Sequence, residues 1–186
     1  MPSHVALLRG INVGGHNKVA MADLRDVVAS LGHTDVETYI QSGNVVFTSA
    51  ETDTAAVAAA LERAIAERTG VQAGVVVVSR EELDRIVAGN PYPEETDPKR
   101  VHVVFHRGGT RGTDAVAAAE QRAWDKGSPD RATVVDGTLY LHTPDGLGRS
   151  ELAAQLARPA VAREVGDTAT TRNWSTVLRL HAMLQG

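Results

Sequence analysis

The sequence predicts an α+β protein in which an N-terminal ferredoxin-like βαββαβ half is followed by a diverged, incomplete α/β half that ends in helices. Three observations support this class. Short β-branched runs with a period of two alternate with longer segments in which apolar residues recur at helical spacing. Gly or Pro follows most of these segments, as expected where elements end. The strand and helix patterns also come in the same order in both halves of the chain.

The first half contains the pattern of four strands and two helices. A Ser42-Gly43 pair separates two of the strands, which are therefore expected to form a hairpin with polar residues at its tip. Gly32 and Gly70 follow the two helices, where glycine adopts the left-handed conformation that ends a helix. In chain order the expected elements are a strand over 5–11, a helix over 20–31, strands over 35–41 and 44–49, a helix over 54–68 and a strand over 73–79.

The second half follows a short helix and a linker rich in Pro and acidic residues. Ser79 is the expected N-cap of that helix, with Glu82 as its capping-box partner. A strand, a helix and a hairpin come next, and Asp136-Gly137 is the strongest hairpin signal in the chain. We therefore expect a ferredoxin-like subdomain over 1–80, a helix and linker over 81–98, and a second α+β subdomain with C-terminal helices over 99–186.

The last segment of the chain predicts a helix with no strand before it. Thr170 or Thr171 is its expected N-cap, and Arg172 and Asn173 then fall in its first turn. A cation in the first turn opposes the helix macrodipole. A bound anion would offset this unfavourable interaction.

The composition is that of an ordinary globular protein, with 42% hydrophobic and 23% charged residues. Cys is absent, which excludes disulfides, thiolate nucleophiles and Cys-based metal sites. A formal net charge of -4 gives no reason to expect bulk attraction to nucleic acid or to an anionic membrane. The N-terminus has no basic segment followed by an apolar run, and no apolar run approaches the length of a membrane span, so we expect a cytoplasmic protein.

The opening strand and the turn that leaves it carry the first functional signal. Arg9 lies among apolar residues, where an unpaired guanidinium is costly, so we expect a carboxylate, carbonyl groups or an anionic ligand beside it. The Gly-rich turn over 14–18 leads into a helix, and such a turn can present backbone N–H groups to an anion. Its spacing matches neither the phosphate loop nor the dinucleotide-binding turn. The alternative is that Gly14 and Gly15 only permit positive φ angles in a strand-to-helix connection.

Five motifs can be read together along the chain: LLRGINVGG, NKVAM, YIQSGNVVF, YLHTPDGLGRS and ATTRNW. They resemble the bacterial family known as domain of unknown function 1697, over nearly the whole chain. The resemblance implies an α+β protein with a ferredoxin-like N-terminal half, and it brings no known activity. One departure is visible, because Glu151-Leu152 stands where the family pattern has Lys-Leu.

The motif residues are polar and fall at turns, hairpin tips and helix starts, whereas packing motifs would be apolar. We therefore expect a small anionic ligand, bearing phosphate or carboxylate and including nucleotides, in a polar cleft between the two halves. The alternative is that Arg9 and Arg149 pair with Asp145 and backbone carbonyls to join the halves. The expected ligand contacts are Arg9, Asn12, Asn17, Lys18, Gln41, Ser42, Asn44, Arg149, Ser150, Arg172 and Asn173.

Catalysis is not assigned by the sequence, and whether the protein is an enzyme stays open. The candidates for a base or nucleophile form no recognisable triad. His102, His106 and His142 could meet across neighbouring strands, but no tight spacing of His and carboxylate predicts a metal, and no motif names a cofactor. The candidate residues are His16, Lys18, Ser42, Tyr140, His142, Asp145 and Ser150.

Two other classes of function compete with the anion-binding hypothesis. A βαββαβ sheet can offer an open face to RNA bases, but the first strand has no aromatic residue and the third only Phe47, so we do not expect a nucleic acid partner. The other class is a structural or regulatory dimer formed through sheet edges, so a monomer or a homodimer is expected. Steep salt dependence of binding would identify RNA, and concentration-dependent mass without a ligand response would identify the dimer.

Overall fold

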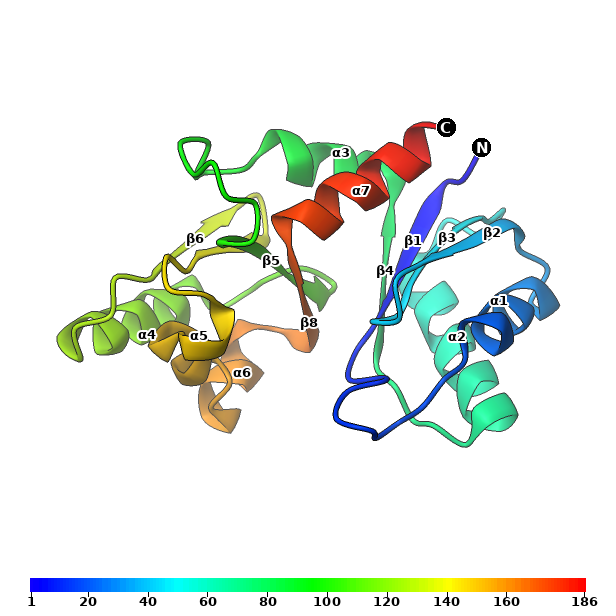
Figure 1. Cartoon of the computed structure of the whole chain (residues 1–186), viewed down its shortest axis with the longest axis horizontal. Coiled ribbons are helices and arrows are strands. Elements are labelled where there is room, and N and C mark those ends of the chain that lie inside the picture. Colours follow the sequence, from blue (N-terminus) through cyan, green and yellow to red (C-terminus); the bar gives the residue numbers. More distant parts are fainter. The chain divides into compact units, whose positions relative to one another are not determined.

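The computed structural model describes residues 1–186, and the chain forms two compact units in it. Unit 1 comprises Met1–Val87 together with Leu178–Gly186, and unit 2 comprises Ala88–Val177. Figure 1 follows the chain through unit 1, then unit 2, and back to unit 1 in the last helix. The division expected from the sequence placed these C-terminal residues with the second half, whereas in the structure they pack in the first.

Unit 1 is built on a four-stranded antiparallel sheet with the strand order β2-β3-β1-β4. Two helices connect the strands in the ferredoxin-like βαββαβ order, so the predicted fold class is confirmed for this half. The elements are β1 (His4–Leu8), α1 (Met21–Ser30), β2 (Thr34–Tyr39), β3 (Asn44–Thr48), α2 (Thr54–Thr69), β4 (Val75–Ser79) and α3 (Arg80–Ala88).

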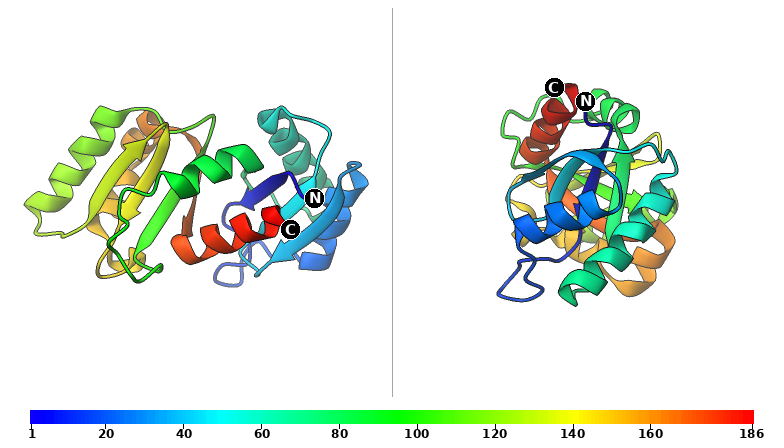
Figure 2. Two further views of the ribbon diagram at one scale, coloured as in Figure 1. Left: turned by 90° about the horizontal axis from the view of Figure 1, so that it is seen from above. Right: turned by 90° about the vertical axis from the view of Figure 1, so that its right-hand side faces the viewer.

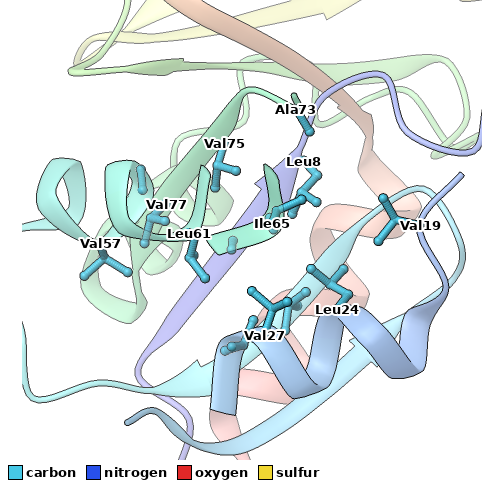
Figure 3. Packing of buried hydrophobic residues seen from close by; sticks show 14 of the residues in the cluster. Leu8, Val19, Leu24, Val27, Val57, Leu61, Ile65, Ala73, Val75 and Val77 are labelled. Carbon is cyan, nitrogen blue, oxygen red and sulfur yellow. The ribbon is translucent and has the colours of Figure 1, made fainter. Parts of the chain in front are cut away.

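The main core of unit 1 lies between the sheet and helices α1 and α2. Figure 2 shows these two helices from two further directions, and Figure 3 shows their apolar side chains meeting those of β1 and β4. Local chemistry bounds α2 at both ends. The carboxylate of Asp53 accepts hydrogen bonds from the first-turn N–H groups, and Gly70 ends the helix in the left-handed conformation, at φ 73°. The buried side chains include Leu8, Leu24, Val27, Leu61, Ile65 and Val77.

The end of the last helix, α7 (Trp174–Gln185), is tied to α3 within unit 1. The Nε2 atom of His181 lies 2.7 Å from Oδ1 of Asp84, and Gln185 donates to the same oxygen at 2.9 Å. These contacts and the buried Leu180 and Leu184 explain why the C-terminal residues belong to unit 1.

Unit 2 repeats the same sheet order, with β6-β7-β5-β8 and antiparallel neighbours throughout. Asp136 and Gly137 both have positive φ, at 48° and 75°, as a two-residue hairpin turn requires, so the hairpin predicted there is confirmed. The elements are β5 (Val101–Arg107), α4 (Thr113–Asp125), β6 (Arg131–Val135), β7 (Thr138–His142), the short 3-10 helix η1 (Leu147–Arg149), α5 (Glu151–Leu156), α6 (Pro159–Val165) and β8 (Asp167–Asn173).

Strand β8 corrects one expectation for the second half. The segment expected to open the last helix instead pairs with β5, and Asn173 rather than Thr170 or Thr171 caps α7, through a bond from Thr176 N–H to its Oδ1. The physical reason is that β-branched residues favour a pleated surface, and β5 offers an edge for them to pair with. The chain does end in helices as predicted, but unit 2 also has the closing strand that the sequence did not reveal.

Helices α4, α5 and α6 cover one face of the unit 2 sheet and share a core with it. Leu152 of α5 and Ala119 and Ala123 of α4 are fully buried there. The helices of both units are too short or too polar for any of them to span a membrane.

Candidate functional site

Three connections of unit 1 meet at one end of its sheet. They are the loop over 9–19 between β1 and α1, the hairpin tip over 40–43, and the segment over 70–74 before β4. Antiparallel pairing places them together, because Leu8 N–H donates to the carbonyl of Gly43 at 2.9 Å and Arg9 N–H donates to that of Gly74 at 2.8 Å. We call the loop over 9–19 the Asn12 loop.

Asn12 organises this loop with its side chain. Its Nδ2 donates to the carbonyls of Val19 at 2.9 Å and Gln41 at 2.8 Å, and its Oδ1 accepts from Val19 N–H at 2.9 Å. Asn17 closes the loop from the other side by donating from Nδ2 to the carbonyl of Gly10 at 3.1 Å. Both asparagines have positive φ, which this residue type tolerates better than most. Their amides therefore hold the loop in shape.

The tip of the Asn12 loop is a tight turn. Val13 and His16 form an isolated β-bridge, and Gly14 and Gly15 between them have φ of 59° and 78°. Two consecutive positive φ angles are the geometry of a two-residue hairpin turn, which glycine adopts without steric cost. The turn leaves the side chain of His16 exposed to solvent.

The hairpin tip beside the loop is also held from within. Asn44 is fully buried, and its Nδ2 donates to the carbonyl of Tyr39 and to Oγ of Ser42, both at 3.0 Å. Gly43 has φ of 87°, and a Cβ atom there would lie 2.8 Å from Cβ of Leu8. No larger residue fits this position without moving β1, so the glycine fixes how closely the tip packs.

Three cationic or titratable side chains of the Asn12 loop take no part in this network. Arg9, His16 and Lys18 are exposed, and none makes an ion pair or a side-chain hydrogen bond within the chain. Of the partners expected for Arg9, no carboxylate or carbonyl group of the chain is found, because β1 ends at Leu8 and the side chain is exposed to solvent. The anionic ligand stays a prediction. The first acidic residue of the chain is Asp23, so no carboxylate in the first 22 residues offsets these charges.

The expected contacts of the second half belong to unit 2 and have structural partners there. Ser150 caps α5 by accepting from Ala153 N–H at 2.9 Å, and its hydroxyl donates to Oδ2 of Asp130 at 2.8 Å. Arg149 is exposed and makes no contact of this kind with Asp145 or another acid. Ser150 is thus a helix cap whose oxygen is already occupied.

Arg172 is the one buried cation among the expected contacts. It lies in β8 opposite Val103, and its guanidinium donates to Oγ1 of Thr170 at 2.7 Å and to the carbonyl of Thr171 at 3.0 Å. Burial lowers the pKa of this guanidinium to about 10. The sequence placed Arg172 in a first helical turn, whereas its position inside a strand removes the argument from the helix macrodipole.

The catalytic candidates do not assemble into a constellation. Tyr140 is fully buried, and desolvation raises its pKa to about 12. His142 lies 2.8 Å from a Glu95 carboxylate oxygen, while His102 and His106 contact threonine hydroxyls instead. No group of three His, Cys, Asp or Glu side chains is placed to hold a metal ion.

One feature of unit 2 was not expected from the sequence. A surface hollow of about 370 Å³ in unit 2 is lined by residues from α4 and from the start of β6. Trp124, which lines it, is 65% exposed. The available signal was its spacing, because Glu120 and Trp124 lie four residues apart on the side of α4 that carries no core residues.

The fold and the geometry define a protein of two units with the ferredoxin-like sheet order, one of which carries a hydrogen-bonded loop with unpaired positive charge. The chain belongs to the family described as "Protein of unknown function (DUF1697)", whose model matches residues 1–140. The predicted family membership is therefore confirmed, on a match that covers residues 1–140.

The structure is similar to that of the conserved bacterial protein SP0830 from Streptococcus pneumoniae, with 28% sequence identity, 98% of each chain covered and a TM-score of 0.73. A second solved structure, "Putative Chlorite dismutase TA0507", matches over 99% of this chain and 100% of that chain, with 15% identity and a TM-score of 0.28. That score is too low to carry an argument. No significant match is found among curated proteins.

Proposed function

We propose that unit 1 binds a small anion, bearing phosphate or carboxylate, at the Asn12 loop. The observation that carries this proposal is the set of exposed, unpaired side chains of Arg9, His16 and Lys18 on a loop whose backbone is held by its own asparagines. The protein as a whole has a formal net charge of -4, so this local positive charge stands against the overall balance.

The loop geometry supports joint use of two of these charges. The hydrogen bond from Asn17 to the carbonyl of Gly10 brings the two sides of the loop together. Arg9 precedes Gly10 and Lys18 follows Asn17, so both lie at the base of the loop. A single exposed ion pair contributes only about 0.2–1 kcal/mol, so binding requires several contacts at once from groups that need little ordering.

The start of helix α1 adds a further favourable element. Ala20 occupies the N-cap position and supplies no side-chain cap for the first-turn N–H groups. An anion near Lys18 can accept hydrogen bonds from such groups and interact with the helix dipole. Asp23 lies in the same turn and opposes this effect, although its carboxylate is 3.9 Å from the guanidinium of Arg68.

An RNA-binding role has less support. Phe47, the aromatic residue that an open sheet face would use for stacking, is fully buried in the core under the helices. Because base recognition by such sheets depends on exposed aromatic side chains, we favour a small anion as the ligand. No catalytic role is assigned to the residues of the Asn12 loop.

The test is a thermal-shift screen of the full chain against inorganic phosphate, nucleotides, sugar phosphates, carboxylates and short RNAs. A ligand at 100 times its dissociation constant contributes about 2.7 kcal/mol and should raise the melting temperature of a chain of this length by about 5–10 °C. We expect the shift to shrink in Arg9→Ala and in Lys18→Ala, and to shrink further in the double variant. Arg149→Ala, which removes an exposed arginine from unit 2, is the matched control.

The outcomes separate the alternatives. A shift that is lost equally in the Arg149→Ala control would contradict a site in unit 1. Stabilisation by short RNAs alone, with steep salt dependence, would favour the RNA-binding class. No change in the melting temperature with any compound of the panel would overturn the proposal.

A further inference from the structure

The surface hollow of unit 2, which we call the Trp124 hollow, is lined by an aromatic ring and charged side chains. Its lining residues are Glu120, Gln121, Trp124, Asp130 and Arg131. The buried side of α4 consists of Val116, Ala119 and Ala123, and the indole of Trp124 is not part of that core. The fold therefore does not account for an indole that is 65% exposed beside a hollow of about 370 Å³.

Both carboxylates of the Trp124 hollow are fixed by hydrogen bonds. Oε2 of Glu120 accepts from the N–H of Ala132 on the edge strand β6, at 2.6 Å. Oδ2 of Asp130 accepts from the hydroxyl of Ser150 at 2.8 Å. Each acid thus uses one oxygen to hold its position, which orders the group before any ligand arrives.

Asp130 points to a ligand more directly than Glu120 does. It is 4% exposed, yet it lines the hollow, and its Oδ1 atom accepts no hydrogen bond within the chain. This oxygen is not among the buried polar atoms that lack a partner, so it is accessible from the hollow, where a positively charged or hydrogen-bonding group can contact it.

We propose that the Trp124 hollow binds an alkylated ammonium group. The face of an indole attracts organic cations through its quadrupole, and aromatic side chains with nearby acids are how proteins recognise quaternary ammonium ions. Glu120 and Asp130 supply the opposite charge, and with Arg131 included the lining keeps a net charge of −1. Alkyl groups on the nitrogen suit Trp124, because they contact the ring while the charge stays near the carboxylates.

The test uses tetramethylammonium as the probe and Trp124 fluorescence as the readout. The chain has two tryptophans, so the titration is performed on a Trp174→Phe variant in which Trp124 is the single indole. We expect a saturable change in its emission that sodium chloride at equal ionic strength does not produce. An identical change with sodium chloride would overturn the proposal.

Variants then assign the contacts, with binding measured by titration calorimetry. Trp124→Leu should weaken tetramethylammonium binding by about 2- to 5-fold, the range expected for a cation–aromatic contact at an exposed ring. Asp130→Asn, which keeps an acceptor for Ser150, should also weaken it. Asp145→Asn removes an exposed acid elsewhere in unit 2 and is the matched control. Unchanged binding in both Trp124→Leu and Asp130→Asn would refute the site.

The ammonium group can come from a free small molecule or from a methylated lysine of another protein. A trimethyllysine peptide and glycine betaine are therefore titrated beside tetramethylammonium. Tighter binding of the peptide would assign the source to a protein partner, and tighter binding of betaine would assign it to a small molecule whose carboxylate reaches Arg131. Both results support the ammonium site, and binding of none of the three probes would overturn it.

Discussion

The two units differ in the connection between the first strand of the sheet and the first helix that follows it. In unit 1 the connection is the Asn12 loop together with Ala20, and in unit 2 it is the shorter segment over 108–112. The short segment is closed down, because Thr110 N–H donates to the carbonyl of Gly137 at 2.7 Å and Arg111 N–H to that of Val165 at 2.6 Å.

The charged groups follow the same contrast. In unit 2 the guanidinium of Arg111 lies 3.3 Å from the carboxylate of Asp167, and the buried His106 contacts the hydroxyl of Thr110 at 2.9 Å. In unit 1, Arg9 and Lys18 have no acidic partner. The comparison teaches that one sheet order accommodates both a sealed end and an open one, and that loop length and the placement of acids decide between them.

Gly112→Ala, in the short connection of unit 2, should cause the largest loss in the free energy of unfolding. Gly112 has φ of 58°, and a Cβ atom there would overlap the carbonyl oxygen of Glu164. Left-handed strain and overpacking together predict a loss of about 2–5 kcal/mol, measured by urea denaturation. The control is Gly108→Ala, where φ is 77° but nothing lies within 4 Å, so only about 1–2 kcal/mol should be lost. Equal losses in the two variants would contradict the close packing at Gly112.

The open end of unit 1 should lose its shape in Asn12→Gly. Glycine keeps the positive φ but removes the hydrogen bonds to Val19 and Gln41, which should cost about 1–3 kcal/mol. Hydrogen exchange at the Val19 amide should accelerate, and anion binding should weaken. Gln41→Ala is the control, because only the backbone carbonyl of Gln41 receives the bond. An unchanged Val19 amide would show that Asn12 does not hold the loop.

Histidines in both units should make stability fall in mild acid. Burial lowers the pKa of His4, His33, His102 and His106 below the ordinary value of 6.5. The unfolded chain therefore binds protons near that value while the folded chain resists them, so stability is complete above about pH 6.5 and is lost as the pH falls towards the lowered values. The urea midpoint should drop between about pH 7.5 and pH 5.5.

Replacing the two histidines of unit 1 distinguishes the contribution of each unit to this loss of stability in acid. His4 and His33 belong to unit 1, where the ring of His4 stacks on Phe47 and the ring of His33 contacts it at a tilt. In a His4→Gln and His33→Gln double variant, the fall of the urea midpoint in acid should be smaller. The part of the fall that is due to His102 and His106 of unit 2 should remain. A double variant with the full acid sensitivity of the parent would place the effect elsewhere.

The smallest effect is expected from the exposed arginines that distinguish the two ends. Arg111→Ala removes a surface pair whose side chains are more than half exposed, so it should lose less than about 1 kcal/mol. Arg9→Ala has no partner within the chain to lose and should leave stability within about 0.5 kcal/mol of the parent, while reducing the proposed anion response. Marked destabilisation by Arg9→Ala would mean that the arginine has a structural role after all.

The candidate site was only partly predictable. Arg9 and Lys18 were named from the sequence, and the structure leaves both exposed and unpaired. Asn12, Asn17, Asn44 and others were named as ligand contacts, and their polar atoms are found in hydrogen bonds that shape the loop, the hairpin or a helix end. Polar motif residues at turns look the same in sequence whether they hold the backbone or a ligand, because the partner of an amide is decided by tertiary distance. Whether any of them also contacts a ligand stays a prediction.

The βαββ order of each half, the hairpin turn at Asp136-Gly137 and the ends of α1 and α2 follow from the sequence alone, because they depend on residues close together in the chain. Only the tertiary structure decided the strand β8, the return of the C-terminal residues to unit 1 and the Trp124 hollow. A threonine-rich segment becomes a strand when it finds an edge such as that of β5, and Asp130 comes near Trp124 only because α4 packs on the sheet. Such contacts join residues that local patterns do not link.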